Sequence, residues 1–363
     1  MDYIKNIVAL AIGIILSFIL LEIVLNFHNP FPIQKKGDKV VLISNVNRVY
    51  KLNGKGKLES QVINTTNSLG FRGPELQNKN DYKIIIAGGS VAACVFTSDS
   101  LTWPFLLYQK LKKNRNDIWL NNASIGGHSA LGVIAMLKHH IVPLKPDMVL
   151  FSLGWNDILY KDNWGYGNWI EKEQKSLVTD LVKSSELIAT VAYTVRTYFG
   201  IEKTISQGKV WDFEKMNTYI ADNHLISNEL ETIEIEKSVL KFEQKLKKII
   251  DICLDNNITP VLMTHSTVVG NAIDPTTGIN LGQLPPKWIN KDGMSSLMDY
   301  HLLQKHNDKI REIAKNENIH LVELENKLNK DTKYYYDYIH YSNDGEQAVA
   351  DIIFTSLKAF FAK

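Results

Sequence analysis

The stretch from Lys83 to Ala92 reads KIIIAGGSVA, a short apolar run that ends in two glycines and a serine. An apolar run of this length, bounded by glycine, is typical of a buried strand in a parallel sheet. From residue 82 onward such runs alternate with longer amphipathic stretches, which predicts strands and helices laid alternately on one sheet. The expected fold class is therefore α/β.

Five apolar runs are predicted strands, at residues 83–87, 118–122, 148–153, 260–264 and 320–323. Helices are predicted where apolar residues recur at helical spacing, at 233–255, 298–316 and about 344–361. Residues 28–81 are expected to form an N-terminal extension of short strands and turns. The main domain is then 82–363, with an insertion at about 158–232 where an ordinary crossover needs only about a dozen residues.

The insertion is aromatic in its first part, at Tyr160, Trp164, Tyr166 and Trp169, and a later loop at 270–292 is rich in glycine and proline. One interpretation is a lid or a wall of a substrate pocket. The other is ordinary surface packing of a helical subdomain, and the sequence does not separate the two.

Composition narrows the function. The 363 residues are 45% apolar, which is enough for a sizeable buried core. Forty-one Lys and Arg stand against 39 Asp and Glu, a net charge of +2, so nucleic acid is not an expected partner. Cys94 and Cys253 lack the spacing of a disulfide framework or a zinc site, and Cys94 is expected to be a small buried residue.

Residues 7–27 read IVALAIGIILSFILLEIVLNF, about the 20 apolar residues that cross a bilayer, with one acid at Glu22. A signal peptide usually has a shorter apolar core and a small-residue cleavage site, and no such site follows. We therefore expect an uncleaved anchor at 1–27 rather than a signal peptide or a core helix. Lys5 precedes the run whereas Lys35, Lys36 and Lys39 follow it, so loop charge alone favours a cytoplasmic body.

Ser90 stands at the carboxyl end of the first predicted strand, where α/β sheets place ligands. Gly88 and Gly89 let the backbone turn tightly and leave the hydroxyl open. Such a turn also suits a phosphate, although neither nucleotide-binding glycine pattern is present, and by itself it suits a purely structural role.

Two further strands end in glycine and a polar group, with NASIGG at 122–127 after the second and GWND at 154–157 after the third. The carboxyl ends of parallel strands form one rim. The N–H of Gly127 and the side-chain amide of Asn156 would then lie beside Ser90 as donors to an oxyanion. Taken singly, each is also an ordinary turn residue.

The last candidate pair is Asp337 and His340. A serine hydroxyl needs a base to remove its proton, and the base needs a carboxylate to hold its tautomer. A spacing of three residues allows both side chains on one turn. A lone pair of this kind is more often a surface pair or a cap, so it carries weight only with the other blocks.

In this order, residues 88–90, 122–127, 154–157 and 337–340 together resemble the four sequence blocks of the SGNH/GDSL hydrolase family. The resemblance spans residues 65–360 and implies a flavodoxin-like three-layer α/β/α domain with a five-stranded parallel sheet. The family's name-giving block is Gly-Asp-Ser, whereas this chain has Gly89 at the second position. With this glycine, the chain is similar to those membrane-anchored bacterial members of the family that also carry a stretch like NSLGFRG at 67–73.

The resemblance implies that Ser90 is the nucleophile, His340 the base and Asp337 its orienting acid. The oxyanion hole would comprise the N–H groups of Ser90 and Gly127 and the side chain of Asn156. It implies a serine esterase without metal or cofactor, acting on a small-molecule ester or on a glycan or lipid ester, such as an acetyl ester of a cell-envelope glycan. Members with such an anchor usually resemble exported enzymes, so the catalytic domain is expected to be periplasmic or extracellular.

Two other functions stay open. The same residues suit an O-acyltransferase of surface polysaccharide, in which a sugar hydroxyl replaces water. The fold also suits a non-catalytic glycan-binding module, although the intact set of site residues argues against it. Other histidines have weaker claims: His139 and His140 lack a second ligand pair, and His265 and His128 are candidates for the border of the site.

Overall fold

The computed structural model describes residues 2–27, 35–36, 39–53, 56–158, 185–198, 210–216, 229–285 and 296–361. The four aromatic residues of the predicted insertion lie outside these ranges. The chain divides into two compact units. The first comprises Met1–Ile43 and Ile170–Ile205, and the second comprises Ser44–Trp169 and Ser206–Lys363.

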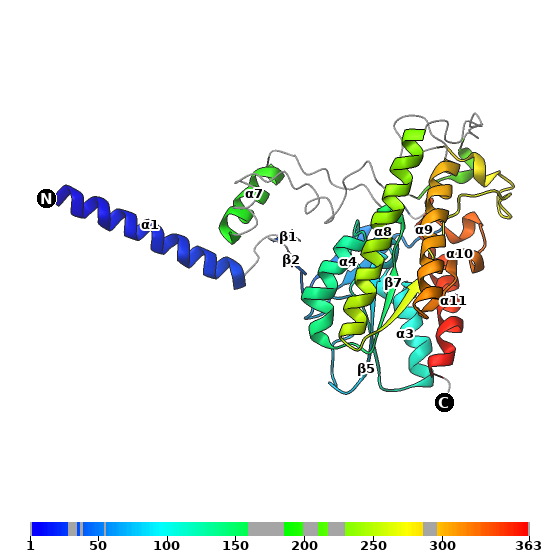
Figure 1. The fold of residues 1–363 in the computed structure, drawn as a ribbon, viewed down its shortest axis with the longest axis horizontal. Coiled ribbons are helices and arrows are strands. Elements are labelled where there is room, and N and C mark those ends of the chain that lie inside the picture. The colour runs from blue at the N-terminus through cyan, green and yellow to red at the C-terminus, as the bar shows by residue number, and fades with distance from the viewer. Residues whose placement is uncertain are drawn as a thin grey trace. The chain divides into compact units, whose positions relative to one another are not determined.

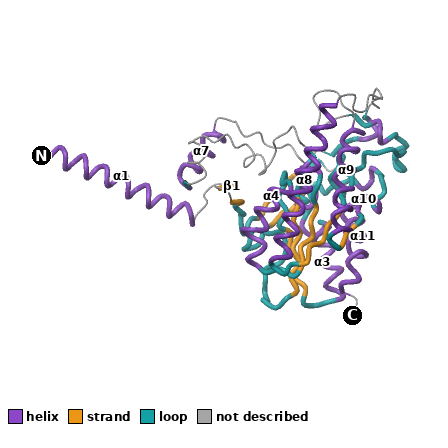
Figure 2. The backbone as a smooth tube through the Cα atoms, in the orientation of Figure 1, coloured by secondary structure: helices purple, strands orange, loops and turns teal. Residues whose placement is uncertain are grey.

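The second unit is built on a five-stranded parallel sheet in the order β6-β5-β7-β8-β9 (Figures 1 and 2). Its strands are β5 (Tyr82–Gly88), β6 (Ile118–Asn122), β7 (Met148–Ser152), β8 (Thr259–Met263) and β9 (His320–Val322). In the register, Ile84 lies between Leu120 of β6 and Met148 of β7. The expected α/β class and the five predicted strands are confirmed.

The central strands are apolar throughout because helices cover both faces of the sheet. Ile84, Ile85 and Ile86 of β5 are fully buried, and so are Val149 and Leu150 of β7. Alternate residues of these strands point to opposite faces, so both faces contribute to the core. This explains why the strands read as continuous apolar runs rather than as alternating ones.

Helices form the outer layers. α3 (Trp103–Asn114) and α11 (Asn343–Phe361) pack together on one face, while α4 (Ala130–Met136), α8 (Glu229–Asp255) and α9 (Ser296–Asn316) pack in series on the other (Figure 1). The helices predicted at 233–255, 298–316 and 344–361 are confirmed as α8, α9 and α11. The three-layer arrangement is confirmed as well. Two short helices, α2 (Ser90–Ala93) and α10 (Leu324–Lys327), follow β5 and β9.

Residues ahead of the sheet form two antiparallel hairpins, β1 (Lys35–Lys36) with β2 (Lys39–Val40), and β3 (Asn47–Lys51) with β4 (Gln61–Thr65). After β4 the chain reaches the parallel sheet, where Arg72 forms an isolated bridge with Asn122 at the end of β6. The stretch NSLGFRG is therefore hydrogen-bonded to the edge of the sheet and does not extend freely into solvent.

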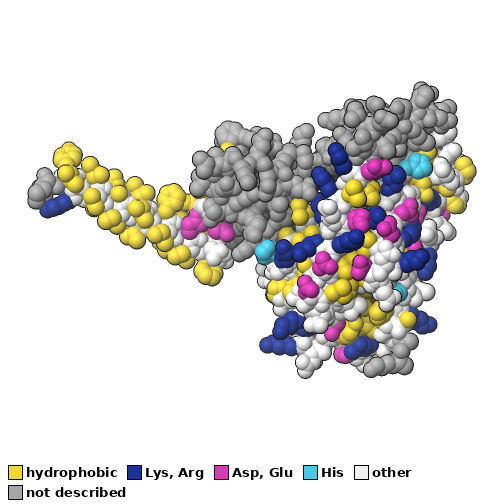
Figure 3. Space-filling model, in the orientation of Figure 1, with side chains coloured by type: hydrophobic (Ala, Val, Ile, Leu, Met, Phe, Trp, Pro, Cys, Tyr) yellow, Lys and Arg dark blue, Asp and Glu magenta, His cyan; other side chains and the backbone are white. Residues whose placement is uncertain are grey.

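The first unit contains α1 (Asp2–Phe27) packed with α7 (Glu186–Tyr198). Hydrophobic side chains cover the exposed surface of α1 (Figure 3). The helix is long and apolar enough to cross a membrane, and by length and composition it fits an anchor or a signal sequence.

Candidate active site

The strand order explains why the candidate residues gather at one edge. From β5 the chain passes to β6 on one side and then returns past β5 to β7 on the other. In open α/β sheets such a reversal leaves a crevice at the carboxyl ends of the two strands, and ligands bind there. Ser90 follows β5 and Asn156 follows β7, so both residues lie at the carboxyl ends of the two strands where the order reverses.

A chain of hydrogen bonds joins the three predicted catalytic side chains. Nε2 of His340 lies 2.9 Å from Oγ of Ser90, although the two residues are 250 positions apart. Nδ1 of the same ring lies 2.7 Å from Oδ2 of Asp337. All three residues are buried, with exposed fractions of 8% for Ser90, 7% for His340 and 4% for Asp337, so little water competes for these bonds. The structure therefore brings these three residues together.

A tight turn holds the acid and the imidazole in place. Oδ1 of Asp337 accepts hydrogen bonds from the N–H groups of Ile339, at 3.0 Å, and His340, at 2.8 Å, which leaves Oδ2 for the ring. The ring of Tyr336 lies parallel to that of His340, with 10° between their planes. Sequence reasoning missed this stacking residue, and the tyrosine run at 334–336 was its only local signal.

The expected oxyanion donors stand on the neighbouring loops. Asn156 donates one amide hydrogen to the carbonyl of His128 at 2.8 Å, which leaves its second hydrogen available. Gly127 has a φ of 80°, in the left-handed region that favours glycine, and its N–H donates no hydrogen bond to any residue that the structure describes. Asp157 accepts from the N–H of Ala130 and so caps α4 beside this loop.

Gly89, directly before Ser90, is crowded by its neighbours. A Cβ added to Gly89 would lie 2.4 Å from Nδ2 of Asn156 and 3.0 Å from the carbonyl oxygen of His128. Gly88 is equally crowded, because its Cβ would lie 2.5 Å from the carbonyl oxygen of Ser152. In this chain the amide of Asn156 therefore approaches the backbone before Ser90 closely enough to exclude a side chain.

We expect Gly89→Ala to destabilise the protein by about 1–3 kcal/mol and to lower esterase activity, because the new methyl group displaces Asn156. Gly126→Ala is the matched control, since nothing lies within 4 Å of the added Cβ there. Thermal unfolding and ester hydrolysis, measured on both variants in parallel, test this. Equal behaviour of the two variants would show that the contact with Asn156 is unimportant.

The other histidines are placed as follows. His265 follows β8 and stacks on Trp155, with ring centroids 6.1 Å apart, and burial lowers its pKa to about 4, so its imidazole is neutral. His128 contributes its carbonyl to Asn156, whereas His139 and His140 lie in a distorted turn after α4. Whether His265 and His128 contact substrate stays a prediction. In the described part of the chain, no three His, Cys, Asp or Glu side chains cluster as a metal site would require.

Cys94 is buried, as predicted, and ends α2. Burial, with the nearby carboxylate of Glu346, raises the pKa of its thiol well above the usual value. A protonated thiol in this setting is a poor nucleophile, so Ser90 has no competitor of that kind close by.

Comparison with known proteins gives the following similarities. No protein-family profile matches the chain. A curated relative, the esterase TesA of Pseudomonas aeruginosa, is 32% identical over 74 residues, which are 20% of this chain and 37% of the relative. The matched segment thus spans little more than a third of that esterase.

Similar solved structures include an acetyl xylan esterase (15% identity, TM-score 0.43, covering 76% of this chain and 99% of the other). Another is a GDSL-like lipase from Bacteroides thetaiotaomicron (12% identity, TM-score 0.40, covering 79% and 91%). The sequence match to TesA agrees with the expected similarity to esterases.

Proposed function

We propose that this protein is a serine esterase that works through an acyl-enzyme on Ser90. The observation that supports this most strongly is the continuous set of hydrogen bonds from Ser90 through His340 to Asp337. Acyl transfer by a serine requires a base that is hydrogen-bonded to the hydroxyl group. It also requires an acid that is hydrogen-bonded to the other nitrogen of that base. The sequence match to an esterase agrees with it.

In the proposed first step, Nε2 of His340 takes the proton of Ser90 while Oγ attacks the carbonyl carbon of the ester. The bond to the alcohol oxygen then breaks, and the imidazolium returns the proton to the leaving alcohol. Water, deprotonated by the same imidazole, then attacks the acyl carbon, the bond to Oγ of Ser90 breaks, and the imidazolium returns the proton to Oγ as the acid leaves. Asp337 stabilises the imidazolium during both steps and keeps Nδ1 protonated.

The negative charge that develops on the carbonyl oxygen needs donors already in position. We assign this role to the N–H groups of Ser90 and Gly127 and to the remaining amide hydrogen of Asn156. Such donors commonly contribute the largest single share of the rate enhancement in acyl transfer. The bond from Asn156 to His128 supports this assignment because it fixes the orientation of the amide.

The test uses the full chain in detergent. Hydrolysis of p-nitrophenyl acetate and labelling by a fluorophosphonate are the expected results, followed by a panel of acetylated glycans and longer-chain lipid esters. Release of free acetate identifies a hydrolase, whereas transfer of the acetyl group to an added glycan identifies an O-acyltransferase. A chain that neither hydrolyses nor labels would instead be the glycan-binding module.

We further propose that α1 is a retained anchor with the catalytic domain on the periplasmic or extracellular side. The carboxylate of Glu22 accepts hydrogen bonds from the N–H groups of Glu186, at 2.8 Å, and Leu187, at 3.3 Å, and from the hydroxyl of Ser185. Glu22 thus caps the first turn of α7, where a negative charge is favourable. A cleaved signal peptide would take this cap away from α7.

We expect protein extracted from membranes to retain residues 2–27, as judged by its intact mass. Glu22→Ala should also retain residues 2–27, its mass lower only by the substitution itself, but α7 should loosen because the N–H groups of its first turn lose their acceptor. Faster amide exchange over 185–198 measures this loss, and Glu59→Ala, which alters an acid of the second unit, is the control. A mature chain that begins after residue 27 would contradict the anchor.

A further inference from the structure

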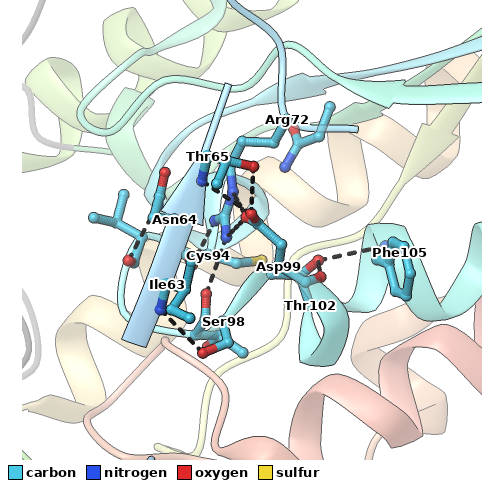
Figure 4. Close-up of polar contacts among 12 residues, drawn as sticks. Ile63, Asn64, Thr65, Arg72, Cys94, Ser98, Asp99, Thr102 and Phe105 are labelled. Atoms are coloured by element: carbon cyan, nitrogen blue, oxygen red, sulfur yellow. Dashed lines mark hydrogen bonds and ion pairs between the residues drawn. The ribbon is translucent and has the colours of Figure 1, made fainter. Parts of the chain in front are cut away.

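Arg72 lies in the stretch NSLGFRG, which the proposed mechanism does not use. Each of its five N–H donors finds an acceptor. Nε and Nη2 donate to Oδ1 of Asp99 at 2.9 and 2.5 Å, and Nη2 also donates to the carbonyl of Thr97 at 3.0 Å. Nη1 donates to the carbonyls of Ala93 and Cys94 at 2.6 and 2.8 Å (Figure 4). With 11% of its side chain exposed, Arg72 is nearly buried.

The carbonyls of Ala93 and Cys94, which Arg72 binds, belong to the end of α2, whose first residue is Ser90. α2 has four residues, and one helical turn is not stable by itself. The last carbonyls of a helix also lack partners within it. Here Arg72 donates to the carbonyls of Ala93 and Cys94, and Nδ2 of Asn122 donates to the carbonyl of Ala92 at 2.7 Å.

The turn that follows α2 needs external support. Cys94 has a φ of 48°, in the left-handed region that non-glycine residues seldom adopt. Such a conformation persists only where the surrounding structure holds it. The bond from Arg72 to the carbonyl of Cys94 is part of that support.

Arg72 is itself fixed to two other elements. Its N–H donates to the carbonyl of Asn122 at 3.0 Å, and the N–H of Asn122 donates back at 2.9 Å, at the end of β6. Its partner Asp99 accepts from the N–H and the hydroxyl of Thr65 in β4, at 2.9 and 2.6 Å (Figure 4). Arg72 therefore links α2 to β6 through its backbone and to β4 through the bond of its guanidinium group to Asp99.

We propose that Arg72 is a positioning residue for the nucleophile. By holding the C-terminal end of α2, it keeps Oγ of Ser90 within hydrogen-bond distance of His340. This inference rests on the proposed function. Reacting groups must be held within about 0.5 Å, and a misplacement of about 1 Å can cost about 100-fold in rate. Lysine cannot replace Arg72, because an ammonium group has three donors and no planar fork.

The test compares Arg72→Ala and Arg72→Lys with wild type, as the full chain in detergent with p-nitrophenyl acetate. We expect kcat to fall about 10- to 100-fold in both variants while KM changes less than about twofold. Added guanidinium ion should restore part of kcat in Arg72→Ala and none in Arg72→Lys, because only the alanine variant leaves room for it.

Arg311→Ala is the matched control. Arg311 is also partly buried, at 23% exposure, and binds Asp308 of α9, Glu325 of α10 and Glu323, which lies between β9 and α10, away from α2. This variant should lose thermal stability but keep kcat. If Arg72→Ala loses stability to the same extent and also keeps kcat, Arg72 is merely structural and the proposal is overturned.

Amide exchange over residues 88–98 provides a readout that does not need activity. It should quicken in Arg72→Ala and stay at the wild-type rate in Arg311→Ala. If wild type shows no esterase activity, the proposed function fails, and the exchange result alone then decides whether Arg72 holds α2. Unchanged exchange in Arg72→Ala overturns the inference whether or not the protein is active.

Discussion

Ser90→Ala is expected to abolish fluorophosphonate labelling and to lower kcat/KM for ester hydrolysis by about 10⁴-fold or more. The reason is that no other nucleophile can take the place of Oγ next to Nε2 of His340. Any residual rate would come from the oxyanion donors and from substrate binding, which the substitution leaves in place. Labelling and steady-state kinetics on the purified full chain measure both effects.

Ser124→Ala is the matched control for this experiment. Ser124 belongs to the same rim of loops, and its buried hydroxyl has no hydrogen-bond partner among the described residues. We therefore expect the Ser124→Ala variant to keep its activity and its labelling. If the Ser90→Ala variant is still labelled, Ser90 is not the nucleophile, because the reagent must then react with another residue.

Asp337→Asn is expected to lower kcat by about 10⁴-fold with little loss of stability. An asparagine can still accept the N–H groups of Ile339 and His340 through its oxygen, so the turn is preserved. Its amide nitrogen would face Nδ1 of His340 as a donor. Nδ1 of His340 must then accept that hydrogen bond through its lone pair, so the ring proton moves to Nε2. The imidazole then has no free lone pair toward Ser90 and cannot act as its base.

Asp331→Asn serves as the control for the acid. Asp331 is also buried and accepts hydrogen bonds from Thr276 and from the N–H of Lys333, but it has no bond to His340. It should lose stability rather than activity. A fall in kcat of similar size in both variants would mean that the loop as a whole, and not the bond from Asp337 to the imidazole, governs the rate.

The match between expected and observed elements is closest where a local pattern is strong. The strand predicted at 83–87 is β5 at Tyr82–Gly88, and the helix predicted at 233–255 is α8 at Glu229–Asp255. An apolar run or a period of 3.6 residues depends on neighbours in the chain, so it can be recognised without the fold. The domain boundaries and the roles of the site residues stay predictions.

The sequence could not reveal the contacts that depend on how loops approach one another. Gly89 looked like a residue of a tight turn, whereas its crowding comes from Asn156, which follows a different strand. Arg72 stood in a stretch that the sequence singled out, but its role could not be inferred, because its partners are Asp99 and backbone carbonyls that any sequence would present. Likewise, Glu22 looked like an interruption of an apolar helix, and its partners on α7 lie more than 160 residues away.

By itself, then, the sequence determined the α/β class, the five strands and the four blocks in which Ser90, Gly127, Asn156 and the pair Asp337 and His340 stand. The class and the strands follow from local periodicity, whereas the blocks follow from their resemblance to a known family, and a spacing of three residues allows Asp337 and His340 on one turn. Only the tertiary structure decided that Ser90 meets His340 and that Arg72 binds the end of α2. The physical reason is that strand order and loop paths result from packing between distant segments, which a local pattern does not encode.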